Sequence, residues 1–103
     1  MIDSEKRVEA LLTSGVKRMG GIAYKFVSPG NSGVPDRIIL MPGGHVYFVE
    51  LKREGGQLTS LQKRQITRIM KLDCRVEVLH GLVEVSNFLL RLQKDQQEGG
   101  AGA

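Results

Sequence analysis

Two carboxylates and a lysine near one end of a predicted hairpin are the residues of this chain best suited to chemistry. Asp36 begins one predicted strand, residues 36–41, and Glu50 and Lys52 lie near the end of the next, residues 45–52. The Pro-Gly-Gly loop between them predicts a tight turn, and counting back from it along both strands sets Asp36 opposite Glu50. Directly opposed residues have Cβ atoms roughly 5 Å apart, so like charges there destabilise the sheet. Lys52 lies two residues beyond Glu50 and therefore points to the same face.

Such a pair of carboxylates predicts a site for a hard divalent cation. One ammonium cannot neutralise two carboxylates, whereas Mg²⁺ binds one or two of them, keeps several waters and contacts a phosphate. The Leu51 carbonyl would be a further oxygen ligand, and Lys52 would orient or deprotonate the attacking water, or offset charge on a pentacovalent phosphorane. The competing interpretation is structural: Asp36 would cap a turn, and Glu50 would pair with Lys52 or Arg37. The combination favours a phosphodiesterase.

Length and composition indicate one globular domain. The chain has 103 residues, of which 41% are hydrophobic and 25% are charged, ordinary values for a single core. The net charge of +4 and a pI near 9.5 favour contact with polyanions. No apolar run approaches the ~20 residues of a membrane span, and no signal peptide is evident. Cys74 is the single cysteine, which suits a reducing cytoplasm, and we expect it to be a small buried side chain.

Periodicity and turn residues predict three helices and four strands. Helices are expected at residues 4–19, 59–73 and 83–94, and strands at residues 22–27, 36–41, 45–52 and 75–80. The order αβββαβα predicts a compact α/β domain with a mixed sheet flanked by helices. The last strand should run parallel to the strand ending at residue 52, because a helix connects them. The domain would span residues 1–94, and residues 95–103 would form a flexible C-terminal tail.

Three further polar residues lie on the predicted helices. Gln62 falls near the middle of the second helix's apolar stripe, which comprises Leu58, Leu61, Ile66, Ile69 and Leu72. A buried amide needs partners, so Gln62 either completes a capping box with Thr59 or reaches an active-site water or Lys52, and the two interpretations carry equal weight. On the first helix, Glu5 or Glu9 could project toward the cation, or either could lie on a solvated face.

The outer face of the second predicted helix is basic. Between residues 57 and 72 there is no acidic residue, and four cations lie on or beside this face: Lys63, Arg64, Arg68 and Lys71. A merely solvated face usually has mixed charges, and Arg and Lys are the residues that contact phosphates, so we expect DNA contact here. His45 and His80 have no partners at metal-ligand spacing and are interpreted as a turn residue and a strand-end residue.

A set of short motifs occurs together in this chain: V8-E9, G20-G21, K25-F26-V27-S28-P29-G30, G33-V34-P35-D36-R37, F48-V49-E50-L51-K52 and L58-T59-S60-L61-Q62. The set resembles the VRR-NUC family, the virus-type replication-repair nucleases of the PD-(D/E)xK superfamily, over about residues 4–92. The resemblance implies the αβββαβα PD-(D/E)xK core. It also implies that Asp36 and Glu50 bind Mg²⁺ or Mn²⁺, that Lys52 is catalytic, that Gln62 supports the site, and that Glu9 is the helix acid assisting the metal.

The resemblance also suggests a substrate. Stand-alone members of this length look like phage enzymes that act as homodimers on four-way DNA junctions. The expected function is therefore a Mg²⁺- or Mn²⁺-dependent DNA endonuclease of the Holliday-junction-resolving type, in the cytoplasm of a bacterium or a phage-infected host. The alternatives are a catalytically silent or partner-dependent nucleic-acid-binding module, and a flap or generic DNA nuclease. DNA contacts are expected from Lys25, Ser28, Asn31, Ser32, Arg37, Arg53, Lys63, Arg64 and Arg68.

Overall fold

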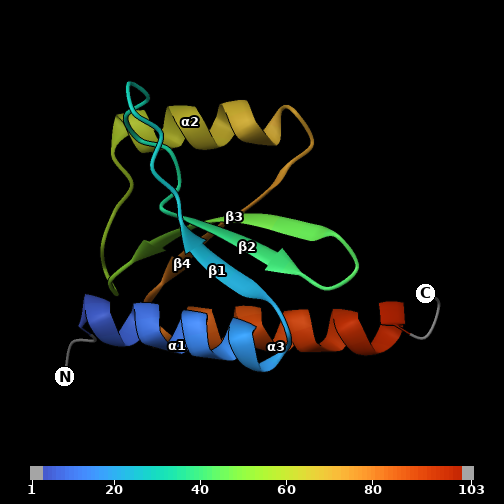
Figure 1. Ribbon diagram of the computed structural model, residues 1–103. Helices are drawn as coiled ribbons and strands as arrows, with labels where there is room; N and C mark the ends of the chain where they lie inside the picture. Colours follow the sequence, from blue (N-terminus) through green and yellow to red (C-terminus); the bar gives the residue numbers. More distant parts are fainter. Residues whose placement is uncertain (1–3, 101–103) are drawn as a thin grey trace.

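The computed structural model describes residues 4–100, and side chains up to residue 98. The elements follow in the order α1 (Glu5–Arg18), β1 (Ile22–Lys25), β2 (Arg37–Met41), β3 (His45–Lys52), α2 (Ser60–Met70), β4 (Arg75–His80) and α3 (Gly81–Gly100). The strands form one sheet in the order β1-β2-β3-β4, antiparallel up to β3 and parallel between β3 and β4. Helices α1 and α3 cover one face of the sheet, and α2 lies on the other (Figure 1). The predicted αβββαβα order and mixed sheet are confirmed.

The β2–β3 hairpin has the predicted register. Gly43 and Gly44 have φ angles of 91° and 81° in the turn after Met41, a conformation that glycine adopts without strain. The turn sets Met41 opposite His45, and the pairing continues to Arg37 opposite Val49. One residue further along each chain brings Asp36 opposite Glu50. The hairpin therefore carries the two acids to the same end of the sheet.

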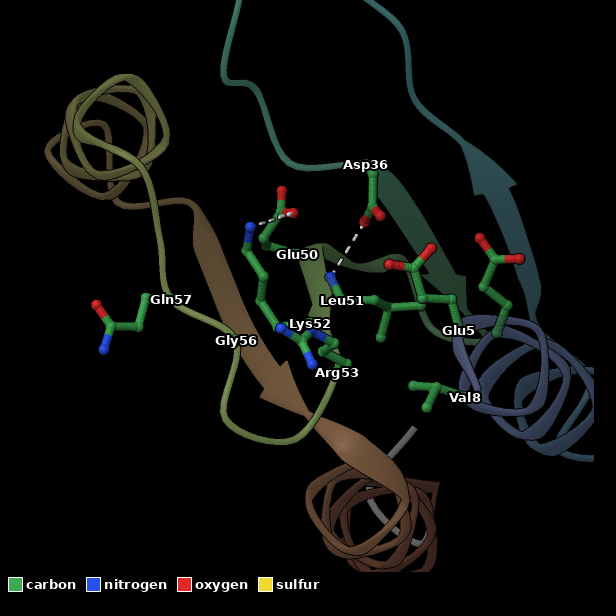
Figure 2. Close-up of a pocket in the computed structure, with 10 residues that line it drawn as sticks. Glu5, Val8, Asp36, Glu50, Leu51, Lys52, Arg53, Gly56 and Gln57 are labelled. Carbon is green, nitrogen blue, oxygen red and sulfur yellow. Dashed lines mark hydrogen bonds and ion pairs between the residues drawn. The ribbon is translucent and has the colours of Figure 1, made fainter. Parts of the chain in front are cut away.

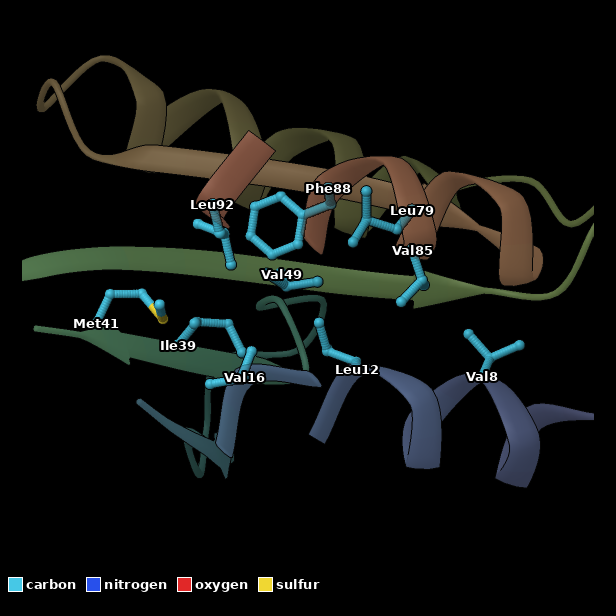
Figure 3. Packing of buried hydrophobic residues seen from close by; sticks show 10 residues of the cluster. All are labelled: Val8, Leu12, Val16, Ile39, Met41, Val49, Leu79, Val85, Phe88 and Leu92. Carbon is cyan, nitrogen blue, oxygen red and sulfur yellow. The ribbon is translucent and has the colours of Figure 1, made fainter. Parts of the chain in front are cut away.

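The hydrophobic core lies between the sheet and the pair of helices α1 and α3 (Figure 3). Its fully buried side chains come from all three parts: Val8, Leu12 and Val16 of α1, Ile39 and Val49 of the sheet, and Val85 and Phe88 of α3. Burying each such side chain contributes ~1.5–3 kcal/mol. Helix α1 begins at the N-cap Ser4, whose Oγ accepts a hydrogen bond from the Arg7 N–H. Its first turns are thus fixed against the sheet, close to the acids.

Helix α2 covers the second face of the sheet only in part. It packs against β4, and Ile66 is the buried residue of the helix. The predicted apolar stripe is wrong at two of its residues, since Leu61 is 54% exposed and Leu72 is 76% exposed. The helix packs mainly along β4 and reaches β3 through the hydrogen bond from Gln62 to Glu50. The sheet face over β1 and β2 is left without a helix on it.

The C-terminal helix differs from the prediction in length. Residues 95–100, which we expected to belong to a flexible tail, continue α3, and residues 101–103 lie outside the described residues. The side-chain amide of Gln96 donates a hydrogen bond of 2.9 Å to the carbonyl of Met19, at the end of α1. This contact ties the added turns to the domain. No helix in the described part of the chain is long and apolar enough to cross a membrane.

Cys74 was wrongly predicted to be buried. It is exposed, and it lies in the turn between α2 and β4. The turn is tight, with Asp73 at a positive φ of 62°, so the chain leaves α2 at the surface before β4 begins. His45 and His80 lie at the turn and at the end of β4, as predicted.

Candidate active site

A pocket of about 430 Å³ opens where the ends of β2 and β3 meet the first turns of α1. Its charged lining consists of Glu5, Glu9, Asp36, Glu50, Lys52 and Arg53. Figure 2 shows the strand residues converging from β2 and β3, with Glu5 and Val8 projecting from α1. The structure therefore brings together Asp36, Glu50, Leu51, Lys52 and the helix acids, which are distant in sequence.

Asp36 is fixed at the open end of the hairpin by hydrogen bonds to β3 and to the residue that follows β1. Its Oδ1 accepts a hydrogen bond of 3.2 Å from the backbone N–H of Leu51 (Figure 2). Its carbonyl oxygen accepts one of 2.8 Å from the N–H of Phe26. Burial raises the pKa of this carboxyl above its usual value, and the Leu51 hydrogen bond and the charge of Arg37 oppose the increase. Asp36 is thus an oriented, partly desolvated carboxylate.

Glu50 is the acid of the pocket whose ionised form is most disfavoured by its surroundings. Only 5% of the residue is exposed. Burial, followed by the negative charge of Asp36, raises its pKa to about 7. Lys52 lies on the same face, but its Nζ is 4.0 Å from Glu50 Oε2 (Figure 2), the outer limit of an ion pair. The structural interpretation of a Lys52–Glu50 pair therefore holds, yet one distant ammonium compensates the two carboxylates only in part.

Gln62 completes the predicted capping box and also reaches a residue of the pocket. Its Oε1 accepts a hydrogen bond of 2.9 Å from the N–H of Thr59, and Thr59 Oγ1 accepts one of 3.1 Å from the N–H of Gln62. This is a complete capping box at the start of α2. Its Nε2 also donates a hydrogen bond of 3.4 Å to Glu50 Oε2. The partner in the pocket is thus Glu50 and not Lys52.

The loop before Asp36 packs directly on the first turn of α2. Gly33 has a φ of 89°, and a Cβ there would lie 2.6 Å from the carbonyl carbon of Leu61 and 2.9 Å from the backbone nitrogen of Gln62. The side chain of Gln65 adds a hydrogen bond of 3.3 Å to the carbonyl of Ser32. This contact sets how near Gln62 lies to Glu50. Sequence reasoning missed the role of Gly33, because the glycine's neighbour comes from a helix 28 residues away.

Arg37 is not available for the DNA contact that we expected. It is 6% exposed, because strand alternation turns it toward α1, and its Nη2 lies 2.7 Å from Glu9 Oε1. The expectation for Arg37 is therefore wrong. The ion pair also distinguishes the two candidate helix acids: Glu9 is held against the sheet, whereas Glu5 is an exposed residue at the pocket's edge.

A profile of the VRR-NUC domain matches residues 6–82. The chain belongs to the VRR-NUC family. A protein named "Putative nuclease p44", from Acyrthosiphon pisum secondary endosymbiont phage 1, is 48% identical over 75 residues, which are 73% of this chain and 81% of the relative. A solved structure named "VRR_NUC domain" has a TM-score of 0.78 and 28% identity, covering 82% of this chain and 92% of that chain. Another, "VRR_NUC domain protein", shares the fold, with a TM-score of 0.65, 22% identity, and coverage of 94% and 91%.

Membership of the VRR-NUC family makes this chain a nuclease, and nucleic acid is its substrate. The other residues expected to touch the substrate lie at the surface. Exposed side chains are those of Lys25, Asn31, Ser32, Arg53, Lys63, Arg64 and Arg68. Ser28 is half-buried, and its Oγ accepts a hydrogen bond of 2.8 Å from Asn31. These positions permit contact with nucleic acid, and the contacts themselves stay predictions.

The oxygen groups of this VRR-NUC site match the ligand preferences of a hard divalent cation. Asp36 and Glu50 provide two carboxylates whose charge is only partly compensated, and the carbonyl of Leu51 directly follows Glu50 on β3. Within residues 4–98, no cluster of three or more acidic, histidine or cysteine side chains could hold a metal ion. Mg²⁺ accepts this arrangement, because it binds through one or two carboxylates and completes its shell with water and phosphate oxygens.

Proposed function

We propose that this chain is a Mg²⁺- or Mn²⁺-dependent endonuclease that hydrolyses phosphodiester bonds in branched DNA, with four-way junctions as the preferred substrate, and that it acts as a homodimer. The observation that carries the metal dependence is the Asp36–Glu50 pair. Two carboxylates meet at one end of a sheet, and the second has a pKa raised to about 7 by burial and by the charge of the first. An arrangement that is costly without a cation is expected where a cation binds.

The roles of the residues follow from their contacts. Asp36 and Glu50, with the Leu51 carbonyl, would hold the ion, which when bound would offset negative charge on the phosphate and lower the pKa of a water. The hydrogen bond from the Leu51 N–H keeps the Asp36 carboxylate turned across the hairpin. Gln62 restrains Glu50 in the same way. Glu9 would assist through water.

Lys52 is the candidate for handling the nucleophile. Its side chain is 17% exposed and lies beside Glu50, at the wall of the pocket. A cation held in a partly desolvated site can orient the attacking water, and it can offset charge that develops on the phosphate oxygens. Both roles require the ammonium to lie near the reacting phosphate, and Lys52 shares one face of β3 with Glu50, a proposed ligand of the ion.

The surface supports DNA as the substrate. On α2, Lys63, Arg64, Arg68 and the following Lys71 are exposed, and the helix contains no acidic residue. The chain's net charge of +4 points the same way. Cationic side chains on one helix face bind phosphates without reading sequence. Recognition by backbone charge is consistent with selection of DNA by its branched shape.

A homodimer is supported by the part of the sheet that α2 leaves uncovered. Ile22 and Val46 flank Leu40 in adjacent strands, so the three share one face, and Tyr24 follows two residues after Ile22. Ile22, Tyr24 and Val46 are 46%, 56% and 41% exposed. Contiguous exposed apolar side chains mark protein contact surfaces. A symmetric dimer would present two active sites to the two strands that resolution of a junction must cut.

The experiment that tests this function compares four substrates side by side: a four-way junction, a flap, a linear duplex and a single strand, each with Mg²⁺, Mn²⁺ or EDTA. We expect cleavage of the junction with either metal, none with EDTA, and a dimer by light scattering. A monomer that cuts linear duplex as readily as junctions would instead be a generic nuclease. Binding without cleavage in either metal would favour the catalytically silent module.

A further inference from the structure

Arg37 is a buried cation at the first position of β2. It pairs in register with Val49 and faces α1, on the opposite side of the sheet from the adjacent Asp36. The residue is 6% exposed, and its Nε is buried without a hydrogen-bond partner among the described residues. A guanidinium stays protonated in a protein, so burial cannot be relieved by loss of the charge. Arg37 must therefore be balanced by a neighbouring anion.

Glu9 provides that balance. Its Oε1 lies 2.7 Å from Arg37 Nη2, a distance typical of a strong charge-assisted hydrogen bond. The Glu9 side chain is 39% exposed, so it keeps part of its hydration. Glu9 also lines the pocket that contains Asp36 and Glu50. The same carboxylate thus partners a buried cation and lines the pocket of the candidate metal ligands, so two roles are open to it: ion-pair partner, and third acid after a change of side-chain conformation.

These two roles compete. A glutamate free on the first turns of α1 could swing toward Asp36 and Glu50 and contribute a third oxygen ligand. Held by Arg37, it remains at the rim, with its charge already compensated. If Glu9 leaves this ion pair, the buried guanidinium of Arg37 is left without a compensating charge. Breaking a buried ion pair in this way is strongly destabilising.

We propose that Arg37 is a positioning residue that holds the Glu9 carboxylate at the rim of the pocket, so that a divalent ion bound by Asp36 and Glu50 recruits Glu9 only in competition with the guanidinium. Competition between the ion and Arg37 for Glu9 rests on the proposed metal site, whereas the hold of Arg37 on Glu9 rests on their ion pair alone. Arg37 itself touches neither the ion nor the substrate. It acts by limiting how readily the Glu9 carboxylate can become a ligand of the ion.

The hold is tested by thermal unfolding in EDTA. Glu9→Gln should lower the melting temperature by more than about 5 °C, because it strands the buried guanidinium. Glu5→Gln, on the same helix and at the same pocket, is the matched control and should change it by less than about 2 °C. Adding Arg37→Met to Glu9→Gln should recover at least half of the loss. If Glu9→Gln is as stable as Glu5→Gln, Arg37 does not hold Glu9.

The competition is tested by calorimetric titration with Mn²⁺. Arg37→Met should bind Mn²⁺ at least threefold more tightly than the wild type, and this gain should vanish in the Arg37→Met, Glu9→Gln double variant. An equal gain with and without Glu9 would mean that only a positive charge had been removed, and would overturn the positioning role. If Arg37→Met does not fold, Arg37→Lys, which keeps the charge, should show a smaller gain with the same dependence on Glu9. Absence of Mn²⁺ binding by the wild type would overturn the metal site and the competition together, while the melting comparison still decides the hold.

Discussion

The side-chain amide of Gln62 donates a hydrogen bond of 3.4 Å to the carboxylate of Glu50, while its carbonyl oxygen closes the capping box at the start of α2. One residue thus links the stability of a helix terminus to the orientation of the most buried acid in the pocket. The two ends of the amide can be tested separately, because Thr59 takes part in the cap and not in the pocket.

Gln62→Ala and Thr59→Ala should both lower the free energy of unfolding by ~1 kcal/mol, since each removes half of the capping box. Only Gln62→Ala should slow cleavage, by about tenfold, because a lost contact of ~1.4 kcal/mol to the ionised Glu50 corresponds to that factor. Urea unfolding and single-turnover cleavage give the two numbers. Equal cleavage rates for the two variants would mean that Gln62 serves the cap alone.

Gly33→Ala should displace the first turn of α2. Its Cβ would lie 2.6 Å from the carbonyl carbon of Leu61, which is backbone and cannot move alone. Gly30→Ala is a matched control, with a similar φ of 81° and no atom within 4 Å of the added Cβ. The control should cost ~1–2 kcal/mol for the left-handed conformation. Gly33→Ala should cost at least about 2 kcal/mol more by urea unfolding and should reduce cleavage. Equal costs would show that the loop does not brace α2.

Glu50 should make the metal-free protein less stable as the pH rises. Its pKa is raised from 4.5 to about 7 in the folded state, so the folded protein holds the proton more tightly than the unfolded chain does. The contribution of protonated Glu50 to the free energy of unfolding is then fully present below pH 4.5 and is lost as the pH rises through about 7. In EDTA at pH 8, Glu50→Gln should therefore be more stable than the wild type by ~1–3 kcal/mol, with little difference at pH 4. Glu54→Gln, at an exposed position, is the control. A Glu50→Gln advantage that does not change with pH would contradict the raised pKa.

Reversing charge on the outer face of α2 should weaken DNA binding. Arg64→Glu with Arg68→Glu should lower affinity for every DNA tested and reduce the salt dependence by about two counterions, with no effect on Mn²⁺ binding. Lys17→Glu with Lys94→Glu changes the net charge equally, on the helices across the sheet, and should have a much smaller effect. Light scattering on the same samples checks the alternative that this face meets the partner subunit. In that case the α2 variant would dissociate the dimer.

The hairpin and its acids could be predicted from the sequence because they depend on local rules. The turn at Gly43 and Gly44 fixes the pairing, and strand alternation then sets the faces of Glu50 and Lys52. The Thr59–Gln62 capping box is equally local, since it spans four residues. These features need no knowledge of how distant elements pack.

The incorrect predictions concern residues whose surroundings come from distant parts of the chain. Arg37 looked like a surface cation until α1 placed Glu9 beside it. Leu61 follows a helical pattern, yet α2 packs mainly along β4 and leaves this side chain exposed. The last turns of α3 are polar, and a hydrogen bond from Gln96 to the end of α1 holds them, a contact that periodicity cannot reveal.

The most direct test of the account is cleavage of a four-way junction in Mg²⁺ by Asp36→Ala, with Glu50→Ala and Lys52→Ala beside it and Glu54→Ala as the control. Circular dichroism should show all four folded, since removal of one of two opposed acids relieves repulsion in metal-free buffer. We predict that the three site variants lose cleavage and that the control cuts at the wild-type rate. Cleavage by Asp36→Ala at the wild-type rate would contradict the assignment of this pocket as the active site.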